Sequence, residues 1–559
     1  MKFVANTAER FGIEALLNCY IREFALPNEQ IQFTPVLGGF RVNLPPLSFS
    51  FTVSHPAPLG NYQYLSGPAL NGELLNLAQL AEQLFASVQT QHNEDYTELL
   101  EQVIASQQCM DTLLQNSQPL DMLPQKDAFL ISEQQLKVGH RFHPTPKARV
   151  GMSEQDWLQF SPELGQKFCW HAFAISPDLY DGNDQIQDFI KQQWMPELAD
   201  EAKPVLPVHP WQAEFLLSQP EVKELLEQGK LSYLGACGTE LYATSSLRSC
   251  YAPELDYFCK GSLHVRLTNC LRKNARYELE TAKILSTELK DIEQQLGLSD
   301  FELISEPDFQ SVLSDEKILS EGFALILRDN LFKKESPRSA MAGALFAPQP
   351  EHKPLVHGEL LRAYNHQVSV NDIENWFERY AELIITPTLK LYFEHGVVLE
   401  PHLQNCVIEL TDGKPSKFLY RDLEGTKLVA ELWPTLPKMS DEAQQAVVYS
   451  QEKGWNRINY CLWLNHFSEA IAALANGNGQ IESRLWDVVA NTLARYAQQN
   501  PIGRDTVKQL LRQSTLPNKA NLLVRFLRQA DKQAQYIQIN NPIALAYARQ
   551  QVLTKVAVA

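Results

Sequence analysis

The chain contains 559 residues, of which 44% are hydrophobic and 10% aromatic, and its 49 basic against 66 acidic side chains give a net charge of −17. The apolar content excludes a disordered chain, and the acidic balance argues against nucleic-acid and anionic-membrane binding, because both need a basic surface. At roughly 150 residues per domain, the length predicts about three or four domains.

Targeting and redox features both favour the cytoplasm. The opening of the chain reaches Glu9 and Arg10 before any long apolar run, so no signal peptide is predicted. No apolar stretch approaches the ~20 residues that span a bilayer. The nine cysteines contain no CxxC pair and no zinc-site spacing, which suits a reducing compartment. We therefore expect a soluble, cytoplasmic protein.

The first 135 residues form the first predicted domain. A Pro/Gly-rich, strand-like stretch at 33–68 precedes helical periodicity at 70–88 and 97–114. No catalytic constellation stands out in this part. Turn residues and basic side chains replace the helical pattern from residue 138, so we place a boundary near residue 135.

The second predicted domain, residues 136–354, alternates short apolar runs with helical segments such as 275–296. It ends in FAPQPEHKP, whose closely spaced prolines predict a linker. The third, residues 355–559, is largely helical. The sequence therefore predicts a multidomain α+β chain, mixed α/β in its middle part.

A hairpin is predicted within the helical third domain. A helix that starts near residue 372 should end at Gly396, after which CVIEL, a TDGKP turn and SKFLY form two strands. This arrangement places Glu400 and His402 at the entry of the hairpin and Asp422 at its exit. Two carboxylates can therefore meet at one end of it.

Against the acidic background, three windows contain no Asp or Glu: residues 134–153, 257–277 and 506–530. Solvated basic faces normally carry interspersed acids. Acid-free windows therefore favour sites for a polyanion such as a nucleotide phosphate or a polycarboxylate. Taken singly, each window is also compatible with a plain surface.

In the first window, GHRFHPTPK places His140 and His143 around prolines that forbid a regular helix. The segment is predicted to be a rigid loop that presents both imidazoles and Lys147 to a phosphate. A zinc site would need further ligands, and none occurs nearby at metal-ligand spacing. A structured turn with satisfied histidines is the alternative.

The second window follows TSSLR, which joins the hydroxyls of Ser245 and Ser246 to Arg248. In LHVRLTNCLRKN a strand is predicted to lead into a helix capped by Thr268 and Asn269. Such a cap would place Arg272 on the first helical turn, where helix N-termini bind anions. Capping alone would not explain Arg248 and Lys260 beside it.

Hard oxygen ligands gather around the predicted hairpin in EPHLQN and RDLEG. Glu400, Asn405, Asp422 and Glu424 suit one or two Mg²⁺ ions that bridge nucleotide phosphates. A surface ion pair between Arg421 and Asp422 is the alternative. The order of an Asn-bearing loop, a hairpin and an Asp also resembles the metal-holding part of kinase-like folds. There is no P-loop, GxGxxG, GxSxG or HExxH motif. The residues alone thus indicate a Mg-ATP-using enzyme with an anionic co-substrate.

At these same motifs the sequence resembles the siderophore synthetases that work independently of nonribosomal peptide synthetases, the aerobactin-synthetase-like family. The motifs occur in order: GHRFHPTPKARVGMS with SPEL, LPVHPWQ, TSSLR, the segment 260–272, EPHLQN and RDLEG, with LPNKANLLVRFLRQ near the end. The resemblance implies a cupped hand of thumb, fingers and palm. It also implies a ligase that adenylates a carboxylate, usually citrate, with Mg-ATP, releases pyrophosphate, and transfers the acyl group to an amine or alcohol.

The resemblance also implies roles for residues. Contacts to ATP and the acyl-adenylate would come from His140, His143, Lys147, Ser245, Ser246, Arg248, Lys260, Thr268, Asn269, Arg272, Glu400, Asn405 and Asp422. Among these, Thr268 and Arg272, with His402, would bind the substrate carboxylate. Glu400, Asn405 and Asp422 would hold Mg²⁺. Arg272, His402 and Lys260 would be catalytic, with His402 as a candidate for proton removal from the amine.

The loop departs from the family pattern at Arg141, where the family commonly has proline after the first histidine. Stiffness of the loop is therefore in question, although His143 and Lys147 remain.

Two other functions stay open: a small-molecule kinase, and a non-enzymatic ferric-siderophore-binding or reductase-like protein. The acid (citrate, 2-oxoglutarate or a citryl intermediate) and the nucleophile (polyamine, amino acid or hydroxy acid) are not fixed by the sequence. The family implies a homodimer.

Overall fold

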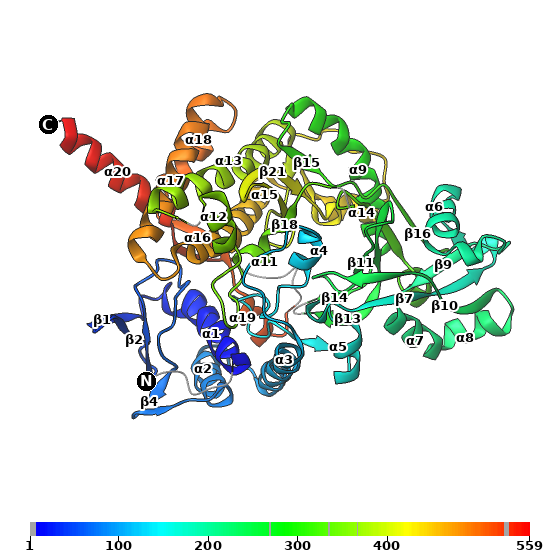
Figure 1. Cartoon of the computed structure of the whole chain (residues 1–559), viewed down its shortest axis with the longest axis horizontal. Coiled ribbons are helices and arrows are strands. Elements are labelled where there is room, and N and C mark those ends of the chain that lie inside the picture. The colour runs from blue at the N-terminus through cyan, green and yellow to red at the C-terminus, as the bar shows by residue number, and fades with distance from the viewer. Residues whose placement is uncertain (1–6, 268–269, 334–335, 366, 530–535, 559) are drawn as a thin grey trace.

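The computed structural model describes residues 7–267, 270–333, 336–365, 367–529 and 536–558. Within them the fold is mixed α/β, with several sheets and many helices (Figure 1). In Figure 1 the N-terminal part lies at the lower left, the middle part at the right and the helical C-terminal part across the top. Among the described residues, no helix is both long and apolar enough to cross a membrane.

The N-terminal part packs helices against a five-stranded antiparallel sheet. The strands follow chain order: β1 Gln32–Val36, β2 Gly39–Asn43, β3 Ser50–Val53, β4 Ala69–Leu70 and β5 Glu73–Leu74. They are flanked by α1 Thr7–Tyr20, a π-helical turn Ile21–Ala25, α2 Leu77–His92 and α3 Thr97–Asn116. Both predicted helices are thus present. Leu522 and Phe526, from α19 Asn521–Phe526, complete this core, so the end of the chain returns to its beginning.

The middle part is built on an eight-stranded antiparallel sheet in the order β8-β16-β17-β12-β11-β10-β7-β9. The strands are β7 Lys167–Ile175, β8 Tyr180–Asp181, β9 Val205–Val208, β10 Leu231–Ala243, β11 Ser249–Tyr251, β12 Tyr257–Gly261, β16 Asp308–Val312 and β17 Leu325–Asp329. Helices α5 Glu154–Phe160, α6 Asp184–Phe189, α7 Pro210–Ser218, α8 Pro220–Glu227 and α9 Arg276–Leu296 accompany it. A second sheet, β14-β13-β6, joins β6 Arg149–Val150 to β13 Leu263–Leu267 and β14 Cys270–Arg272.

The predicted helix cap after β13 is wrong. The chain instead turns back as β14, with Arg272 opposite Leu263, and α9 begins only at Arg276 with Ala275 as its N-cap. The capping contact is made by Glu278, whose side chain accepts from the backbone N–H of Ala275 at 2.9 Å. Arg272 therefore lies on a strand. Thr268 and Asn269 lie outside the described residues.

The C-terminal part surrounds a four-stranded sheet, β15-β21-β20-β18, with helices. The predicted hairpin is confirmed as β20 Cys406–Thr411 and β21 Lys414–Tyr420, and it follows α13 Val370–His395 and Gly396, whose φ of 64° ends the helix. The outer strands β15 Phe301–Leu303 and β18 Ser339–Met341 come from before residue 354. Strands from both sides of residue 354 therefore share one sheet. The predicted domain boundary at residue 354 stays a prediction.

The other elements of this part are short strands and packed helices. They are β19 Val397–Val398, β22 Lys427–Val429, β23 Val448–Tyr449, β24 Thr515–Lys519, β25 Tyr536–Asn540, α11 Ala342–Phe346, α12 Val356–Ala363, α14 Asp441–Val447, α15 Gln451–Ile458, a π-helical segment Asn459–Phe467, α16 Ser468–Ala475, α17 Gly479–Gln499, α18 Arg504–Leu510 and α20 Pro542–Val558. The expected helical character of residues 355–559 is confirmed.

Candidate active site

The three acid-free windows are brought together in space. Strand β6 of the first window pairs with β13 of the second, with Leu267 opposite Arg149. In the third window, Asn521 donates its side-chain amide to the carbonyl of Phe142, at 2.9 Å. Glu23 of the N-terminal part anchors this segment, because its carboxylate accepts from the backbone N–H groups of Leu522 and Leu523. The three acid-free windows, which are far apart in the sequence, thus contact one another in the fold.

The loop of the first window is held by its own histidines. The Nδ1 atom of His140 accepts from the N–H of Phe142 at 3.0 Å, and that of His143 from the N–H of Thr145 at 3.1 Å. His143 is buried, whereas His140 is exposed and its Nε2 lies 2.8 Å from the Asn465 amide. Each imidazole therefore stabilises a tight turn, and His140 also faces the C-terminal helices.

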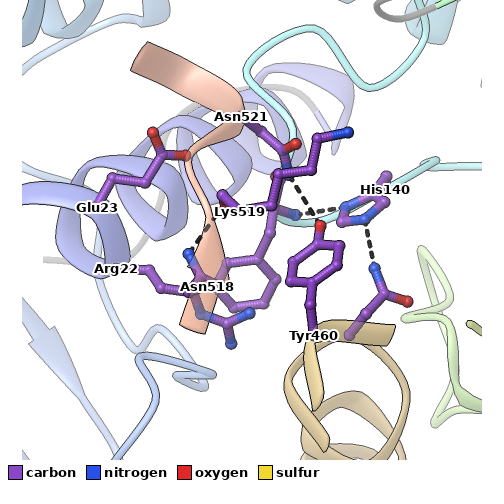
Figure 2. Close-up of a pocket in the computed structure, with 9 residues that line it drawn as sticks. Arg22, Glu23, His140, Tyr460, Asn518, Lys519 and Asn521 are labelled. Atoms are coloured by element: carbon purple, nitrogen blue, oxygen red, sulfur yellow. Dashed lines mark hydrogen bonds between the residues drawn. The ribbon is translucent and has the colours of Figure 1, made fainter. Parts of the chain in front are cut away.

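His140 lines a small polar pocket between the N- and C-terminal parts (Figure 2). The pocket is also lined by Arg22, Glu23, Phe142, Tyr460, Asn465, Asn518, Lys519 and Asn521. Figure 2 shows Lys519 and His140 on neighbouring sides of it, drawn from β24 and from the loop. Lys519 belongs to the third acid-free window and to the motif LPNKANLLVRFLRQ, but it was not among the predicted site residues.

Lys147 is placed differently from the two histidines. Its ammonium contacts the carboxylate of Glu163, which also accepts from Arg149 at 2.8 and 2.9 Å. Burial alone would raise the pKa of Glu163, but Arg149 and Lys147 hold it at about 2. We call these three residues the loop cluster. It joins the two motifs GHRFHPTPKAR and SPEL. The predicted contact of Lys147 with ATP stays a prediction.

The TSSLR turn connects β10 to β11 and leads to the C-terminal part. Ser246 accepts from the N–H of Ser249 at 3.0 Å, which fixes the turn. Ser245 lies 3.3 Å from the Gln404 amide, and its own N–H donates to Glu133 at 3.0 Å. Arg248 is buried, contacts Asn274 and lies 3.3 Å from Glu424. The turn therefore touches both EPHLQN and RDLEG.

The predicted ligands of EPHLQN lie close together around the entry of the hairpin. Glu400 forms a 2.6 Å ion pair with Arg457, and its carbonyl accepts from the Asn405 side chain at 3.3 Å. His402 is half-buried in the same loop. Burial lowers the pKa of His402, although Glu400 and Asp422 oppose the shift. Its imidazole is therefore expected to be neutral at pH 7.

Three cations and three carboxylates meet where the middle and C-terminal parts join. They are Lys260, Arg248 and Arg328 with Glu306, Asp422 and Glu424, which we call the junction cluster. The ammonium of Lys260 contacts Asp422, lies 2.7 Å from Glu424 and 3.4 Å from Glu306. Charges of both signs are equal in number, so the cluster is neutral by itself.

Asp422 is the member of the junction cluster with an unusual backbone and the most exposed acid. Its φ of 82° lies in the left-handed region, which costs energy for a residue with a Cβ and is typical of functional sites. Its side chain is 34% exposed, against 16% for Glu424 and 0% for Glu306. Loss of solvation by burial would raise the pKa of Asp422, but the positive charges of Lys260 and Arg328 hold this pKa below its usual range.

The alternative expected for Asp422, a surface ion pair with Arg421, does not form in the structure. Arg421 is buried and turns the other way, where its guanidinium lies 2.7 Å from Glu133 of α4 Ala128–Glu133. The partners of Asp422 are Lys260 and Arg328.

Arg328 and Glu306 belong to the junction cluster but were not predicted from the sequence. Each is a single charged residue in an ordinary strand or loop. Within the described residues, no three His, Cys, Asp or Glu side chains are placed to hold a metal together.

Comparisons with known proteins identify similar chains. The model of the IucA/IucC family matches residues 128–347, and that of the ferric iron reductase FhuF-like transporters matches residues 374–534. A spermidine–citrate ligase of Bacillus anthracis is 30% identical over 453 residues, which cover 74% of this chain and 73% of that protein. The chain belongs to the IucA/IucC family.

Other proteins are similar along most of the chain. An L-2,3-diaminopropanoate–citrate ligase of Staphylococcus aureus is 28% identical over 441 residues, or 75% of each chain. The structure of ATP-bound aerobactin synthetase from Klebsiella pneumoniae matches 95% of this chain and 99% of its own, with a TM-score of 0.83 at 22% identity. The N-terminal part, which carried little of the sequence resemblance, thus belongs to the shared fold.

Proposed function

We propose that this protein is an ATP-dependent siderophore synthetase that activates a carboxyl group of citrate, or of a citrate derivative, and joins it to an amine. The observation that carries the proposal is the junction cluster together with the family membership: cations from TSSLR and β12 meet the acids of RDLEG at one point. Relatives named as citrate ligases of spermidine and of diaminopropanoate support citrate as the acid and an amine as the acceptor.

The reaction would proceed in two steps. A carboxylate oxygen of the acid attacks the α-phosphorus of ATP, the bond to the β-phosphate breaks and pyrophosphate leaves. The amine nitrogen then attacks the acyl carbon, AMP leaves, and the nitrogen loses a proton. The first step brings two anions together, so fixed positive donors such as Lys260, Arg248 and Arg272 would offset their repulsion and stabilise the transition state. No protein nucleophile is required.

The remaining site roles are proposed from the family motifs. His140, His143, Lys147, Ser245, Ser246, Thr268 and Asn269 would complete the ATP contacts. His402, neutral because of burial, would accept the proton that the amine loses, and with Arg272 would bind the substrate carboxylate. Lys519 would join His140 among the ATP contacts, since both line one pocket.

Mg²⁺ fits the residues present. Asp422, Glu400 and Asn405 offer hard oxygens, and Mg²⁺ is usually held by one or two carboxylates plus nucleotide phosphates rather than by a complete protein cage. The partial exposure of Asp422 suits that arrangement, whereas Glu400 would have to share its carboxylate with Arg457. When bound, Mg²⁺ supplies charge neutralisation at the phosphates.

The larger organisation is also proposed from the family. Residues 1–135, 136–354 and 355–559 would act as thumb, fingers and palm of a cupped hand, with the hairpin as the kinase-like part of the palm. We further propose a cytoplasmic homodimer. Size measurement in solution by light scattering tests the dimer, for which a molecular mass of one chain would be the contrary result.

The test of function is an assay of the first half-reaction. Purified protein is incubated with Mg-ATP and hydroxylamine, and citrate, 2-oxoglutarate or succinate is added separately. Acid-dependent AMP, pyrophosphate and hydroxamate are expected with citrate, because hydroxylamine traps the acyl-adenylate. Formation of ADP without hydroxamate would instead favour a kinase.

A second candidate, binding of a ferric siderophore, is favoured by the FhuF-like match over residues 374–534. It predicts no acid-dependent turnover with any of the three acids, and quenching of the protein fluorescence by a ferric citrate-type siderophore. Turnover with citrate and no quenching would remove this candidate.

A further inference from the structure

Lys260 does not stand alone in the junction cluster, because a second cation shares its partners. Arg328, on β17, lies beside β12 in the sheet, and its backbone pairs with Phe258 rather than with Lys260. Its guanidinium nevertheless converges on the same carboxylates: Nη2 lies 2.6 Å from Glu306 and 3.1 Å from Asp422. Both cations are nearly buried, with 3% and 6% of their side chains exposed. Two buried cations are thus directed at one partly exposed acid.

The carboxylate of Glu306 contacts both Lys260 and Arg328 on the buried side of the cluster. One of its oxygens accepts from Arg328 at 2.6 and 3.0 Å and lies 3.4 Å from Lys260, while the other accepts from the N–H of Glu424 at 3.3 Å. The residue follows β15, which belongs to the C-terminal sheet, and precedes β16, which belongs to the middle sheet. A carboxylate with no solvent exposure therefore ties both cations to the RDLEG turn.

The acids of the junction cluster differ in how readily they can move away from Lys260 and Arg328. Glu306 is fully buried and fixed by four contacts, whereas Asp422 is exposed for a third of its side chain. A triphosphate carries acceptor oxygens that match ammonium and guanidinium donors, and it can replace a carboxylate on them. An acid that leaves must find another positive partner, which a nucleotide-bound Mg²⁺ would provide.

We propose that Arg328 is a further triphosphate-binding residue acting beside Lys260, and that Glu306 is the positioning residue that keeps both cations in place while Asp422 yields them to the nucleotide. Asp422 then acts as an internal competitor of the phosphates until nucleotide and Mg²⁺ arrive together. This inference rests on the proposed function only in taking ATP as the ligand.

The chain offers a matched control pair. Arg338 and Glu359 form an equally buried ion pair, with 6% and 0% of their side chains exposed, just as in Arg328 and Glu306. Arg338 precedes β18, and its other side-chain partners are the carbonyls of Leu123 and Pro124, neither of which belongs to the proposed site. Loss of either pair should therefore cost similar stability, and only one pair should affect nucleotide binding.

The first experiment measures binding of α,β-methylene-ATP, which cannot transfer its adenylyl group, by calorimetry with Mg²⁺. Arg328→Gln is expected to weaken binding by about ten- to one-hundred-fold, the loss typical of a charge-assisted hydrogen bond. Arg328→Lys should recover part of it, and Arg338→Gln should leave it unchanged. Thermal unfolding checks that Arg328→Gln is folded. Equal affinities of the folded variant and the wild type for the analogue would overturn the role of Arg328.

Glu306→Gln distinguishes positioning from a simple field effect. Removal of a negative charge near the phosphates would by itself tighten analogue binding. If Glu306 positions the cations, the variant should bind several-fold more weakly, because Lys260 and Arg328 then depend more strongly on Asp422. Glu359→Gln should show no change. Tighter or unchanged binding by Glu306→Gln would contradict the positioning role.

The competition is tested without Mg²⁺, in EDTA. Asp422→Asn should bind the Mg-free analogue several-fold more tightly than the wild type, since the acid no longer occupies the two cations. Glu424→Gln removes the same charge from Lys260 but leaves Arg328 paired with Asp422, so its gain should be smaller. Equal gains in the two variants, or weaker binding by Asp422→Asn, would contradict the competition.

The readouts separate this inference from the proposed function. A wild type that binds the analogue but makes no acid-dependent AMP would contradict the synthetase and leave Arg328 and Glu306 as nucleotide-binding residues. A wild type that adenylates citrate while Arg328→Gln binds the analogue normally would contradict this inference alone.

Discussion

The loop cluster and the junction cluster use the same kinds of side chain for different purposes. In the loop cluster, Lys147, Arg149 and Glu163 expose 7%, 3% and 4% of their side chains, so every partner is internal. In the junction cluster, one acid is a third exposed and sits on a strained backbone. The loop cluster takes its acid from a nearby turn, whereas Lys260 of the junction cluster pairs with an acid 162 residues away in sequence. The partly exposed Asp422 suits the junction cluster better to exchange a partner for a ligand.

The largest effects are expected at Asp422 of the junction cluster and at Arg272 of β14. Asp422→Ala and Arg272→Ala are each expected to lower citrate-dependent pyrophosphate release at least about a hundredfold, since each removes a charge proposed to act in the transition state. Arg272→Lys should also be poor, because lysine cannot reproduce a bidentate fork. Pyrophosphate assay measures the loss, and thermal unfolding checks the fold. Near-normal turnover in either variant would remove that residue from the site.

The loop cluster should respond in the opposite way. Arg149→Met leaves Glu163 buried with one partner fewer, and removing one member of a buried ion pair costs about 3–5 kcal/mol of the free energy of unfolding. Denaturant unfolding measures this loss. Affinity of the folded variant for α,β-methylene-ATP should change little. A variant of normal stability with lost nucleotide binding would place Arg149 in the site and erase the distinction between the clusters.

Acid should weaken the loop cluster in a defined range of pH. The folded-state pKa of Glu163 is about 2, below its ordinary 4.5, so its ionised form stabilises the folded protein above pH 4.5. That contribution, about 3 kcal/mol by linkage, is lost as the pH falls from 4.5 towards 2. The difference in unfolding free energy between the wild type and Glu163→Gln should shrink over this range. A difference independent of pH would contradict it.

Sequence patterns predicted those parts of the fold that depend on local rules. The helix ending at Gly396, the hairpin around TDGKP and strand β13 follow from periodicity and turn chemistry, and all are present. The predicted cap after β13 failed because pairing with β13 competes with helix formation, and the strand pairing of Cys270–Arg272 won. Local capping signals cannot report such a tertiary alternative.

The site was predictable where motifs carry it and not where single residues do. Lys260 and Asp422 lie in motifs and meet in the structure, 162 residues apart in sequence. Arg328 and Glu306 belong to an ordinary strand and an ordinary loop, so their convergence depends on strand order in two sheets. The three acid-free windows were the best sequence signal of a shared location, because charge composition reports a common environment without reporting contacts.

A smaller effect is expected at His402, which bears on the second step only. Burial lowers the pKa of His402 from 6.5, so the imidazole stays neutral at pH 7 and takes up a proton only at lower pH. Amine transfer should therefore be flat around pH 7 and fall on the acid side below pH 6.5. His402→Gln should slow amine transfer about tenfold more than pyrophosphate release, as followed by product formation in single turnovers. Equal losses in both steps would assign His402 to acid binding instead.

The smallest effect tests whether side-chain contacts can stiffen the loop where the family commonly has proline. Arg141 lies 3.4 Å from Glu469 of α16 and donates to the carbonyl of Tyr62 at 3.1 Å, and its own carbonyl accepts from Asn18 at 3.2 Å. These contacts fix the residue next to His140 from the N- and C-terminal parts at once.

Arg141→Ala should therefore raise the KM for ATP a few-fold with little change in kcat, because the loop would remain folded but sample more conformations. Arg495→Ala, which removes a surface arginine from its pairs with Glu378 and Glu382, is the control. A fall in kcat at constant KM would mean that Arg141 acts on the chemical step, and the loop would then belong with the junction cluster rather than with its support.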